Sequence, residues 1–330
     1  MVLATLWKLK SHFVGFPKSS DFLLEEEELP AIKDGELLLE AEFLSVDPYM
    51  RPYSETKMKE GDVMIGSQVA KVVASKVAEF PVGTFVVSHS GWRSHSISTG
   101  DGLQALPESW PIELSRSLAL GVLGMPGLTA YFGLLEICNP VAGETVLVNG
   151  AAGAVGMLVG QIAKIKGCRV VGFAGSDAKV ALLKELGFDS ALNYRTAASV
   201  DSALREAAPG GYHCFFDNVS WRDFLCAALS HMKHRGRVSI CGGISMYNDA
   251  TSQKLTFPQL TLIFKELKLE GFMVTRWQDR RDEGIAALAA WVKEGKLQYR
   301  ETVTEGFSAM PDAFMGLLRG DNVGKAVVRA

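Results

Sequence analysis

The sequence has little net charge and no long apolar run. Its 330 residues carry a formal net charge of -3, with 22% charged and 48% hydrophobic residues. No basic stretch is longer than a few residues, which argues against a nucleic-acid partner. No run reaches the roughly 18 apolar residues of a membrane-spanning helix, and the opening MVLATLWKLKSHF lacks the regions of a signal peptide. We therefore expect a cytoplasmic protein that binds neither nucleic acid nor membrane.

Cysteine is also scarce, and metal-ligand spacing is absent. The five cysteines lie far apart with no C-x-x-C pair, which favours reduced thiols over a disulfide framework. Among the six histidines only His231 and His234 lie three residues apart. They stand in the polar run HMKHRGR, which indicates an exposed helix end more than a zinc site. We predict no bound metal.

The length predicts two domains, and the first reads as β-rich. Short alternating segments at 35–46, 68–75 and 83–90 are separated by turn residues, a pattern typical of a barrel or a partly open sheet. From about Pro107 to Gly121 the pattern predicts a helix. Residues 124–127 then indicate a hinge into a second helix, LTAYFGLLEIC.

From Glu144 onward strands and helices alternate, which predicts a doubly wound parallel sheet. The tail turns β-like again after Gly295 and is expected to rejoin the first domain. We therefore predict an α/β chain with domains at 1–122 (completed by 301–330) and 123–300. The expected strands are 146–148, 169–174, 190–194, 213–219, 237–242 and 267–274, and the expected helices are 178–186, 200–207, 222–232 and 282–294. In the tail we expect strands at 301–303 and 324–328 around a helix at 311–318.

The first of these strands leads into a glycine-rich turn, ETVLVNGAAGAVGMLVGQIAKIKG. Gly150 permits the tight turn, Gly153 lets the backbone approach a pyrophosphate, and Gly156 lets the helix pack closely on the strand. The pattern predicts a dinucleotide site at the helix N-terminus. An Ala/Gly-rich turn without any ligand is the alternative.

The end of the next strand selects the nucleotide. NAD-binding sheets place an acidic residue there for the adenosine ribose, but this strand ends in Ala174-Gly175-Ser176. Ser176 and Lys179, with Tyr194 and Arg195 at the end of the third strand, suit a 2'-phosphate instead. The sequence thus favours NADP(H) over NAD(H). An ordinary surface role is the alternative for Lys179.

Long motifs throughout the chain carry a family resemblance. They are HFVG (12–15), VDPYMR (46–51), MPGLTAYFGLLEIC (125–138), AAGAVG (151–156), FDNV (216–219), ICGGISMYN (240–248) and AFMGLLRGDNVGK (313–325). With them the chain resembles the medium-chain dehydrogenase/reductase superfamily, from first residue to last. The resemblance implies a GroES-like catalytic domain and a Rossmann NADP-binding domain. The Gly-His-Glu segment and four-cysteine lobe of zinc-dependent members are missing, so the zinc-free branch is implied.

The resemblance implies a set of cofactor-binding residues. They are Gly153, Ala154, Val155 and Gly156 at the pyrophosphate; Ser176, Lys179 and Tyr194 at the 2'-phosphate; Asn218 at a strand end; Ile240, Cys241, Gly242, Gly243, Ile244, Ser245 and Met246 along the nicotinamide; and Gly271, Phe272, Met273, Val274, Thr275, Arg276, Trp277 and Asn322 closing over it. Plain turn residues are the alternative for Asn218, the Gly242-Gly243 pair and Asn322.

Without a metal, the easiest hydride chemistry is addition to a double bond that a carbonyl already polarises. Charge then develops on the carbonyl oxygen, where a hydrogen-bond donor stabilises it. Tyr247 and Tyr49 are the candidate catalytic residues, with packing roles as the alternative. The expected substrate pocket consists of Tyr49, Met50, Arg51, Trp92, Met125, Tyr247 and Trp277, with Arg51 and Arg276 as partners for a substrate carboxylate.

The resemblance implies NADPH-dependent reduction of 15-oxoprostaglandins and 2-alkenals such as 4-hydroxynonenal, with oxidation of the leukotriene B4 12-hydroxyl as a lesser activity. A homodimer is expected by analogy, with the segment GFMVTRW as its edge strand. Phe264 stands where relatives carry a tyrosine, and Thr275 replaces a bulkier aromatic, so the proton donor and pocket size stay open. A zinc-free quinone reductase and a non-catalytic NADPH-binding protein of crystallin type are the alternatives.

Overall fold

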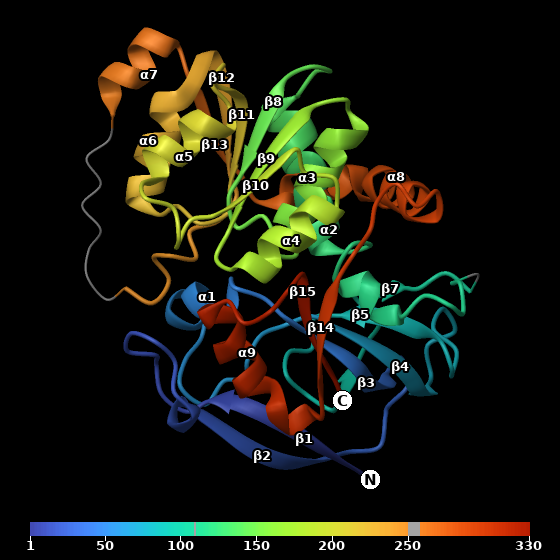
Figure 1. Cartoon of the computed structure of the whole chain (residues 1–330). Coiled ribbons are helices and arrows are strands. Elements are labelled where there is room, and N and C mark those ends of the chain that lie inside the picture. The colour runs from blue at the N-terminus through green and yellow to red at the C-terminus, as the bar shows by residue number, and fades with distance from the viewer. Residues whose placement is uncertain (109, 250–257) are drawn as a thin grey trace. The chain divides into compact units, whose positions relative to one another are not determined.

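The computed structural model describes residues 1–108, 110–249 and 258–330. Contacts divide the chain into two compact units (Figure 1). Unit 1 comprises Met1–Gly121 and Glu301–Ala330, and unit 2 comprises Val122–Arg300. The first and last parts of the chain therefore build one unit, and the middle builds the other.

Unit 1 is built on antiparallel pairing around one long strand, β3 (Leu37–Val46). Its main sheet has the order β14-β15-β3-β4-β5-β7, and β6 also pairs with β3. A separate hairpin pairs β1 (Val2–Leu9) with β2 (Phe22–Leu29). The other elements of unit 1 are β4 (Gln68–Ser75), β5 (Phe85–Ser88), β6 (His95–Ser98), β7 (Gln104–Ala105), β14 (Glu301–Glu305), β15 (Lys325–Arg329), α1 (Met50–Thr56) and α9 (Met310–Arg319).

The strand β3 lies at the centre because its residues are buried on both faces. Leu37 and Leu39 pack with Phe80 and Val86, whereas Leu44 belongs to a second cluster around Trp92 and Phe314. Apolar residues at adjacent as well as alternate positions are what a strand covered on both sides requires. This strand leads directly into α1.

Unit 2 contains a parallel sheet with the order β10-β9-β8-β11-β12-β13. The strand order reverses between β8 and β11, so the topological switch point lies there. The strands are β8 (Thr145–Val148), β9 (Arg169–Ala174), β10 (Ser190–Asn193), β11 (Tyr212–Asp217), β12 (Met232–Ile240) and β13 (Lys268–Gly271). Ligands of such sheets bind outside the carboxyl ends of the strands at this point.

Helices cover both faces of this sheet (Figure 1). On one face α5 and α6 pack together over Leu147, Phe173 and Phe215. On the other, α2 contacts both α3 and α8. The helices of unit 2 are α2 (Met125–Phe132), α3 (Gly156–Ile165), α4 (Asp177–Glu185), α5 (Val200–Ala207), α6 (Arg222–His231), α7 (Gln259–Lys265) and α8 (Arg281–Lys293), and a π-helix, Gly133–Cys138, continues α2.

The predicted α/β class is confirmed, and the alternating strands and helices of unit 2 lie close to their expected ranges. The helix expected over 107–121 is wrong: the described residues form only a 3-10 turn, Arg116–Leu120, because Pro107 and Pro111 disfavour helix before them. The strand expected over 267–274 ends at Gly271, and Val274–Arg280 is 3-10 helix.

Two short helices were not predicted from the sequence. In α7 the segment QLTLIFK is rich in residues that favour strands, and none of its side chains is buried. In α1 the turn begins directly after Pro48 and Tyr49. Neither segment has the length that makes a helical period visible.

Candidate cofactor and substrate site

The glycine turn between β8 and α3 is shaped to receive an anion. Gly150 adopts a φ of +55°, and a Cβ added at Gly156 would lie 2.4 Å from the Gly150 carbonyl oxygen. Helix α3 begins at Gly156 with no side-chain cap. The N–H groups of Gly153, Met157 and Leu158 donate to carbonyl oxygens of this turn, which leaves those of Ala154, Val155 and Gly156 at the positive end of the helix. This donor set fits a pyrophosphate.

The carboxyl end of β9 presents a hydroxyl and nearby cations. Ser176 caps α4, since its Oγ accepts from the Lys179 backbone N–H at 3.4 Å. A Cβ at Gly175 would lie 2.9 Å from the Tyr194 hydroxyl, so Tyr194 lies directly against this turn. The guanidinium of Arg195 lies 5.9 Å from the Tyr194 ring centre. These groups fit the 2'-phosphate of NADP(H).

Two residues near the carboxyl end of β9 were not predicted from the sequence. The carboxylate of Asp177 follows the strand tip by a few residues, but it accepts a hydrogen bond from Asn193 Nδ2 at 2.8 Å. Trp221 lies beside Tyr194, with ring centres 5.8 Å apart. The signal for Trp221 was its position just after β11, at the same edge of the sheet.

The carboxyl ends of β11 and β12 carry Asn218 and the segment 240–246. The backbone N–H groups of Cys241 and Gly242 donate to the Asp217 carbonyl oxygen at 2.8 and 3.2 Å, and Ser245 Oγ donates to the Val219 carbonyl. The Tyr247 hydroxyl oxygen accepts from the Gly243 N–H at 3.3 Å, so Tyr247 folds back over this turn. Residues 240–247 thus form one tight structure beside Asn218.

The Cys241 thiol lies in this turn. Burial, helped by the negative charge of Asp217, raises the pKa of Cys241 to about 12. The thiol is therefore protonated at neutral pH and is a poor nucleophile.

Residues 271–277 make an aromatic and charged cluster within unit 2. Phe272 packs against Phe216 and Trp277, and Trp277 stacks on Phe132 with ring centres 5.3 Å apart. Arg276 forms an ion pair with Glu270 at 2.5 Å and donates to the Gly271 carbonyl oxygen. The guanidinium expected to receive a substrate carboxylate is thus already engaged.

In unit 1, Tyr49 directly precedes α1. Burial raises the pKa of Tyr49 well above its ordinary value, and the charge of Asp47 adds to the effect against a hydrogen bond with Ser67. Ser67 Oγ lies 2.9 Å from His89 Nδ1. The Tyr49 hydroxyl is therefore protonated at neutral pH and suited to donate a hydrogen bond.

Other residues expected in the substrate pocket have core positions in unit 1. Met50 and Trp92 are fully buried in the cluster around Phe314. Arg51 is 2% exposed, pairs with Glu55 at 2.6 Å and donates to the Gly15 carbonyl oxygen.

Two more predicted residues lie in exposed or turn positions. Asn322 Nδ2 donates to the Gly324 carbonyl oxygen in the turn before β15, which gives Asn322 a turn-forming contact. Met125, the first residue of α2 in unit 2, is partly exposed.

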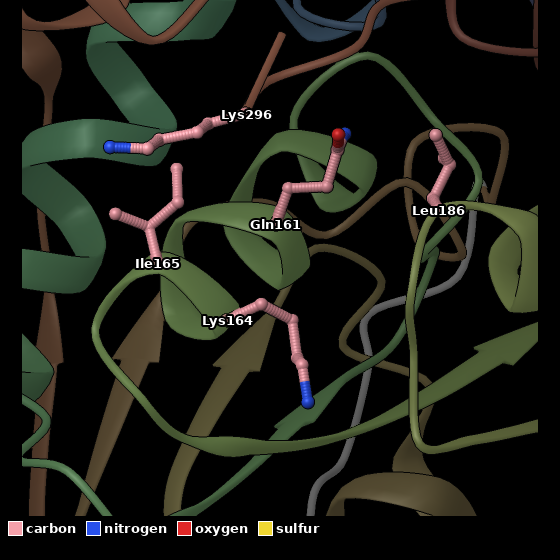
Figure 2. A pocket seen from close by; sticks show the side chains of 5 residues that line it. All are labelled: Gln161, Lys164, Ile165, Leu186 and Lys296. Atoms are coloured by element: carbon pink, nitrogen blue, oxygen red, sulfur yellow. The ribbon is translucent and has the colours of Figure 1, made fainter. Parts of the chain in front are cut away.

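A separate hollow of about 340 Å³ lies in unit 2, lined by Gln161, Lys164, Ile165, Leu186 and Lys296. Figure 2 shows the Lys164 and Lys296 amines pointing away from each other. Lys164 pairs with Asp189 and Lys296 with Glu294, and Gln161 bonds the backbone of Gln298. The hollow therefore offers no convergent polar groups to a ligand.

In the described ranges no three His, Cys, Asp or Glu side chains gather as a group that could hold a metal ion. Across those ranges, too, no helix combines the length and apolarity needed to cross a bilayer. None of the five cysteines, all of which lie in the described ranges, forms a disulfide.

Comparison with known proteins places this geometry in a family. Residues 5–106 match the family model described as the N-terminal domain of oxidoreductase, and residues 154–290 match the model described as zinc-binding dehydrogenase. Prostaglandin reductase 1 of Bos taurus is 58% identical over 331 residues, covering 100% of both chains. The chain belongs to the medium-chain dehydrogenase/reductase superfamily.

Two further proteins are similar over nearly the same span. The 2-alkenal reductase (NADP(+)-dependent) of Nicotiana tabacum is 38% identical, over 97% of this chain and 95% of its own. The crystal structure of CurA in complex with NADPH from Vibrio vulnificus has a TM-score of 0.93 at 37% identity and covers 99% of each chain. The superfamily match therefore extends over both units.

Proposed function

We propose that this protein is an NADPH-dependent reductase of the activated C=C bond of α,β-unsaturated ketones and aldehydes. Unit 2 is the NADP-binding domain, and unit 1 is the catalytic domain. The observation that carries the choice of NADPH is the end of β9, where Ser176, Lys179 and Tyr194 stand in place of a free carboxylate. The names of the similar reductases support it.

When bound, NADPH would supply the hydride for the β-carbon, and the α-carbon would take a proton from solvent or a tyrosine. The glycine turn and α3 hold the pyrophosphate, and Asn218 with residues 240–246 and 271–277 orients the nicotinamide. Tyr247 and Tyr49 supply hydroxyl donors for the substrate carbonyl oxygen, where negative charge develops. The raised pKa of Tyr49 keeps its proton in place for that bond.

The substrates we propose are 15-oxoprostaglandins and 2-alkenals such as 4-hydroxynonenal, with NADP-dependent oxidation of the leukotriene B4 12-hydroxyl as a lesser activity. The protein then takes part in prostaglandin, leukotriene and wider lipid metabolism. We place it in the cytoplasm as a homodimer. The expected edge segment GFMVTRW is strand only at Gly271, so β13, which pairs only with β12 among the described strands, is the edge that supports an edge-to-edge dimer.

Loss of nicotinamide absorbance tests the activity directly. The protein is mixed with NADPH and, in separate cuvettes, 4-hydroxynonenal, a 15-oxoprostaglandin and a quinone. We expect turnover of the enal and the enone. Turnover of the quinone alone would favour the quinone reductase, and NADPH binding without any turnover would favour a non-catalytic binding protein.

Lys179→Ala tests the cofactor assignment. Removing the cation should weaken NADPH binding about tenfold and leave NADH binding nearly unchanged, because only NADPH carries the 2'-phosphate. Lys184→Ala, exposed on the same helix, is the control. Equal effects of Lys179→Ala on the two nucleotides would sink the assignment.

A further inference from the structure

Asp217 is a buried carboxylate whose charge is compensated by neutral donors. It ends β11 and is 0% exposed. Its Oδ1 accepts from Asn149 Nδ2 at 2.6 Å and from the backbone N–H groups of Val219 and Ser220 at 3.0 and 2.8 Å. No Lys or Arg of the described ranges forms an ion pair with it. A buried carboxylate without a cation needs such donors.

The carboxylate fixes which way the Asn149 amide faces. An ionised carboxylate only accepts hydrogen bonds, so Asn149 must turn Nδ2 toward Asp217. Its Oδ1 then faces Asn218, and it accepts from the Asn218 backbone N–H at 2.7 Å. Both ends of the Asn149 side chain therefore have partners of the correct kind.

The same reasoning fixes the neighbouring amide. Asn218 Nδ2 donates to the Asn149 carbonyl oxygen at 2.9 Å, and a carbonyl only accepts. The atom left over on this side chain is Asn218 Oδ1, and none of the described residues donates to it. Asn218 thus presents an acceptor.

Asn218 lies on the nicotinamide side of the switch point. The adenosine half of a dinucleotide lies over the end of β9, so the other half lies over β11 and β12. A Cβ added at Gly242 would lie 3.1 Å from the Asn218 carbonyl oxygen, so the turn after β12 packs against the backbone of Asn218. This packing holds the Asn218 backbone in place.

The loop after Asp217 is held in a conformation that few residues adopt. Ser220 has a φ of +53°, although it is not glycine. Its Oγ lies 2.9 Å from the Gly242 carbonyl oxygen and 3.2 Å from Asp217 Oδ2. Such backbone strain persists where surrounding bonds over-determine the geometry.

We propose that Asp217 is a positioning residue that acts through Asn149 to aim Asn218 Oδ1 at a donor on the nicotinamide riboside half of NADPH. That donor is a ribose hydroxyl or the carboxamide N–H. The inference rests on the proposed function, because it needs a dinucleotide at the switch point. It adds two residues, Asn149 and Asp217, which do not themselves touch the cofactor.

Binding of two ligands to the full-length protein tests this chain of bonds. NADPH carries the nicotinamide riboside, and adenosine 2',5'-bisphosphate lacks it. Asp217→Ala removes the acceptor that orients Asn149. The Kd of this variant for NADPH should rise about five- to tenfold, which corresponds to the loss of one hydrogen bond to the cofactor. Its Kd for the bisphosphate should change less than about twofold. Calorimetric titration gives both values.

Asp217→Asn is the rescue variant. It can keep an acceptor oxygen at the Oδ1 position, so we expect it to restore most of the NADPH affinity. Asn149→Ala should reproduce the NADPH-selective loss, and it decides the matter if Asp217→Ala does not fold. The double variant should bind NADPH no more weakly than the weaker single variant, because both act on one path.

Asp189→Ala is the matched control. Asp189 also accepts a hydrogen bond from a backbone N–H, that of Val170, at 2.7 Å. It directly precedes β10, so it lies at the amino ends of the parallel strands, away from the carboxyl ends where the cofactor is proposed to bind. It should alter stability without changing the ratio of the two Kd values. Equal weakening of both ligands by Asp217→Ala would overturn the inference. A wild type that binds no NADPH would overturn the proposed function itself.

Discussion

Each unit buries an aspartate, and the two are stabilised in different ways. Asp47 of unit 1 is 4% exposed and pairs with Lys325 at 2.8 Å. Asp217 of unit 2 is 0% exposed and accepts only from amide, backbone and hydroxyl donors among the described residues. The charge of Asp47 is neutralised by a cation, whereas the charge of Asp217 is stabilised by neutral hydrogen-bond donors of the surrounding protein.

The ion pair and the set of neutral donors have different consequences for the residues around each carboxylate. The Lys325 amine joins segments 278 residues apart and also donates to the Val46 carbonyl oxygen, so the ion pair closes unit 1. The Lys325 ammonium only donates, and its two partners are oxygens that only accept, so this pair orients no amide side chain. The Asp217 carboxylate, by contrast, fixes which way the Asn149 amide faces, at the carboxyl ends of the strands where the cofactor is proposed to bind.

Lys325→Met should produce the largest effect. It leaves Asp47 buried without its cation, and breaking a buried pair costs about 3 to 5 kcal/mol. Denaturant unfolding with unchanged slope measures the loss. Asp47→Asn in the same chain should recover most of the stability, because no charge is then stranded.

A surface pair provides the control for Lys325→Met. Lys296 and Glu294 lie 2.7 Å apart with both side chains exposed. Lys296→Met should cost less than about 1 kcal/mol. If the two methionine variants lose the same small amount, the buried pair has no special role in closing unit 1.

Asp217→Ala should have an intermediate effect on stability. It strands the Asn149 amide and two backbone N–H groups, but these are neutral, and water can enter the vacated space. We expect a loss of about 2 kcal/mol in the same unfolding assay. A loss as large as that of Lys325→Met would mean that neutral donors and a cation are equivalent here.

Glu301→Gln should stabilise the protein slightly. Burial raises the pKa of Glu301 against the Ser117 hydrogen bond and the Lys325 charge, and its Oε1 is buried without a partner among the described atoms. Because the pKa of Glu301 in the folded protein lies above the ordinary 4.5, the free energy of unfolding of the wild-type protein falls as pH rises through that folded pKa. We expect a gain of less than about 1 kcal/mol at pH near 8. The gain should vanish near pH 4, and thermal unfolding at both pH values checks it.

His213 should give the smallest effect, and only in acid. Burial lowers the pKa of His213, and the charges of Lys233 and Arg237 add to this against that of Glu144. Its Nδ1 accepts from the Thr145 N–H at 2.9 Å, which needs the neutral ring. Stability is therefore full above the ordinary pKa of 6.5 and falls as pH drops through the lowered folded value. A His213→Gln variant should show a smaller fall between pH 7 and 5.

The sequence predicted what depends on local pattern. Buried strands such as β8 and the glycine turn after it are short-range features, and they were found within a few residues. The role of the Asp217 carboxylate was missed because FDNV was interpreted as a family motif that places Asn218 at a strand end. Its role depends on Asn149, which lies 68 residues earlier in the chain.

For the expected substrate pocket, the sequence could not separate residues of a pocket wall from residues of the core. Apolar residues such as Met50 and Trp92 suit a pocket wall and a core equally well in sequence, and the structure buries both. Arg51 was expected at a pocket rim because a guanidinium can pair with a substrate carboxylate through two hydrogen bonds. Its pair with Glu55 is an i,i+4 contact of α1, a helix that was not predicted, and only its bond to Gly15 joins distant parts of the chain.

The division of unit 1 between two ends of the chain bears on how the protein is made. A ribosome synthesises residues 122–300, which form unit 2, before it adds β14, α9 and β15. Unit 2 can therefore fold during translation, as domains generally do. Unit 1 must wait with an open sheet edge at β3 and an uncompensated Asp47 until Lys325 has been added. A stop codon just before that lysine would leave unit 2 intact and unit 1 unfinished.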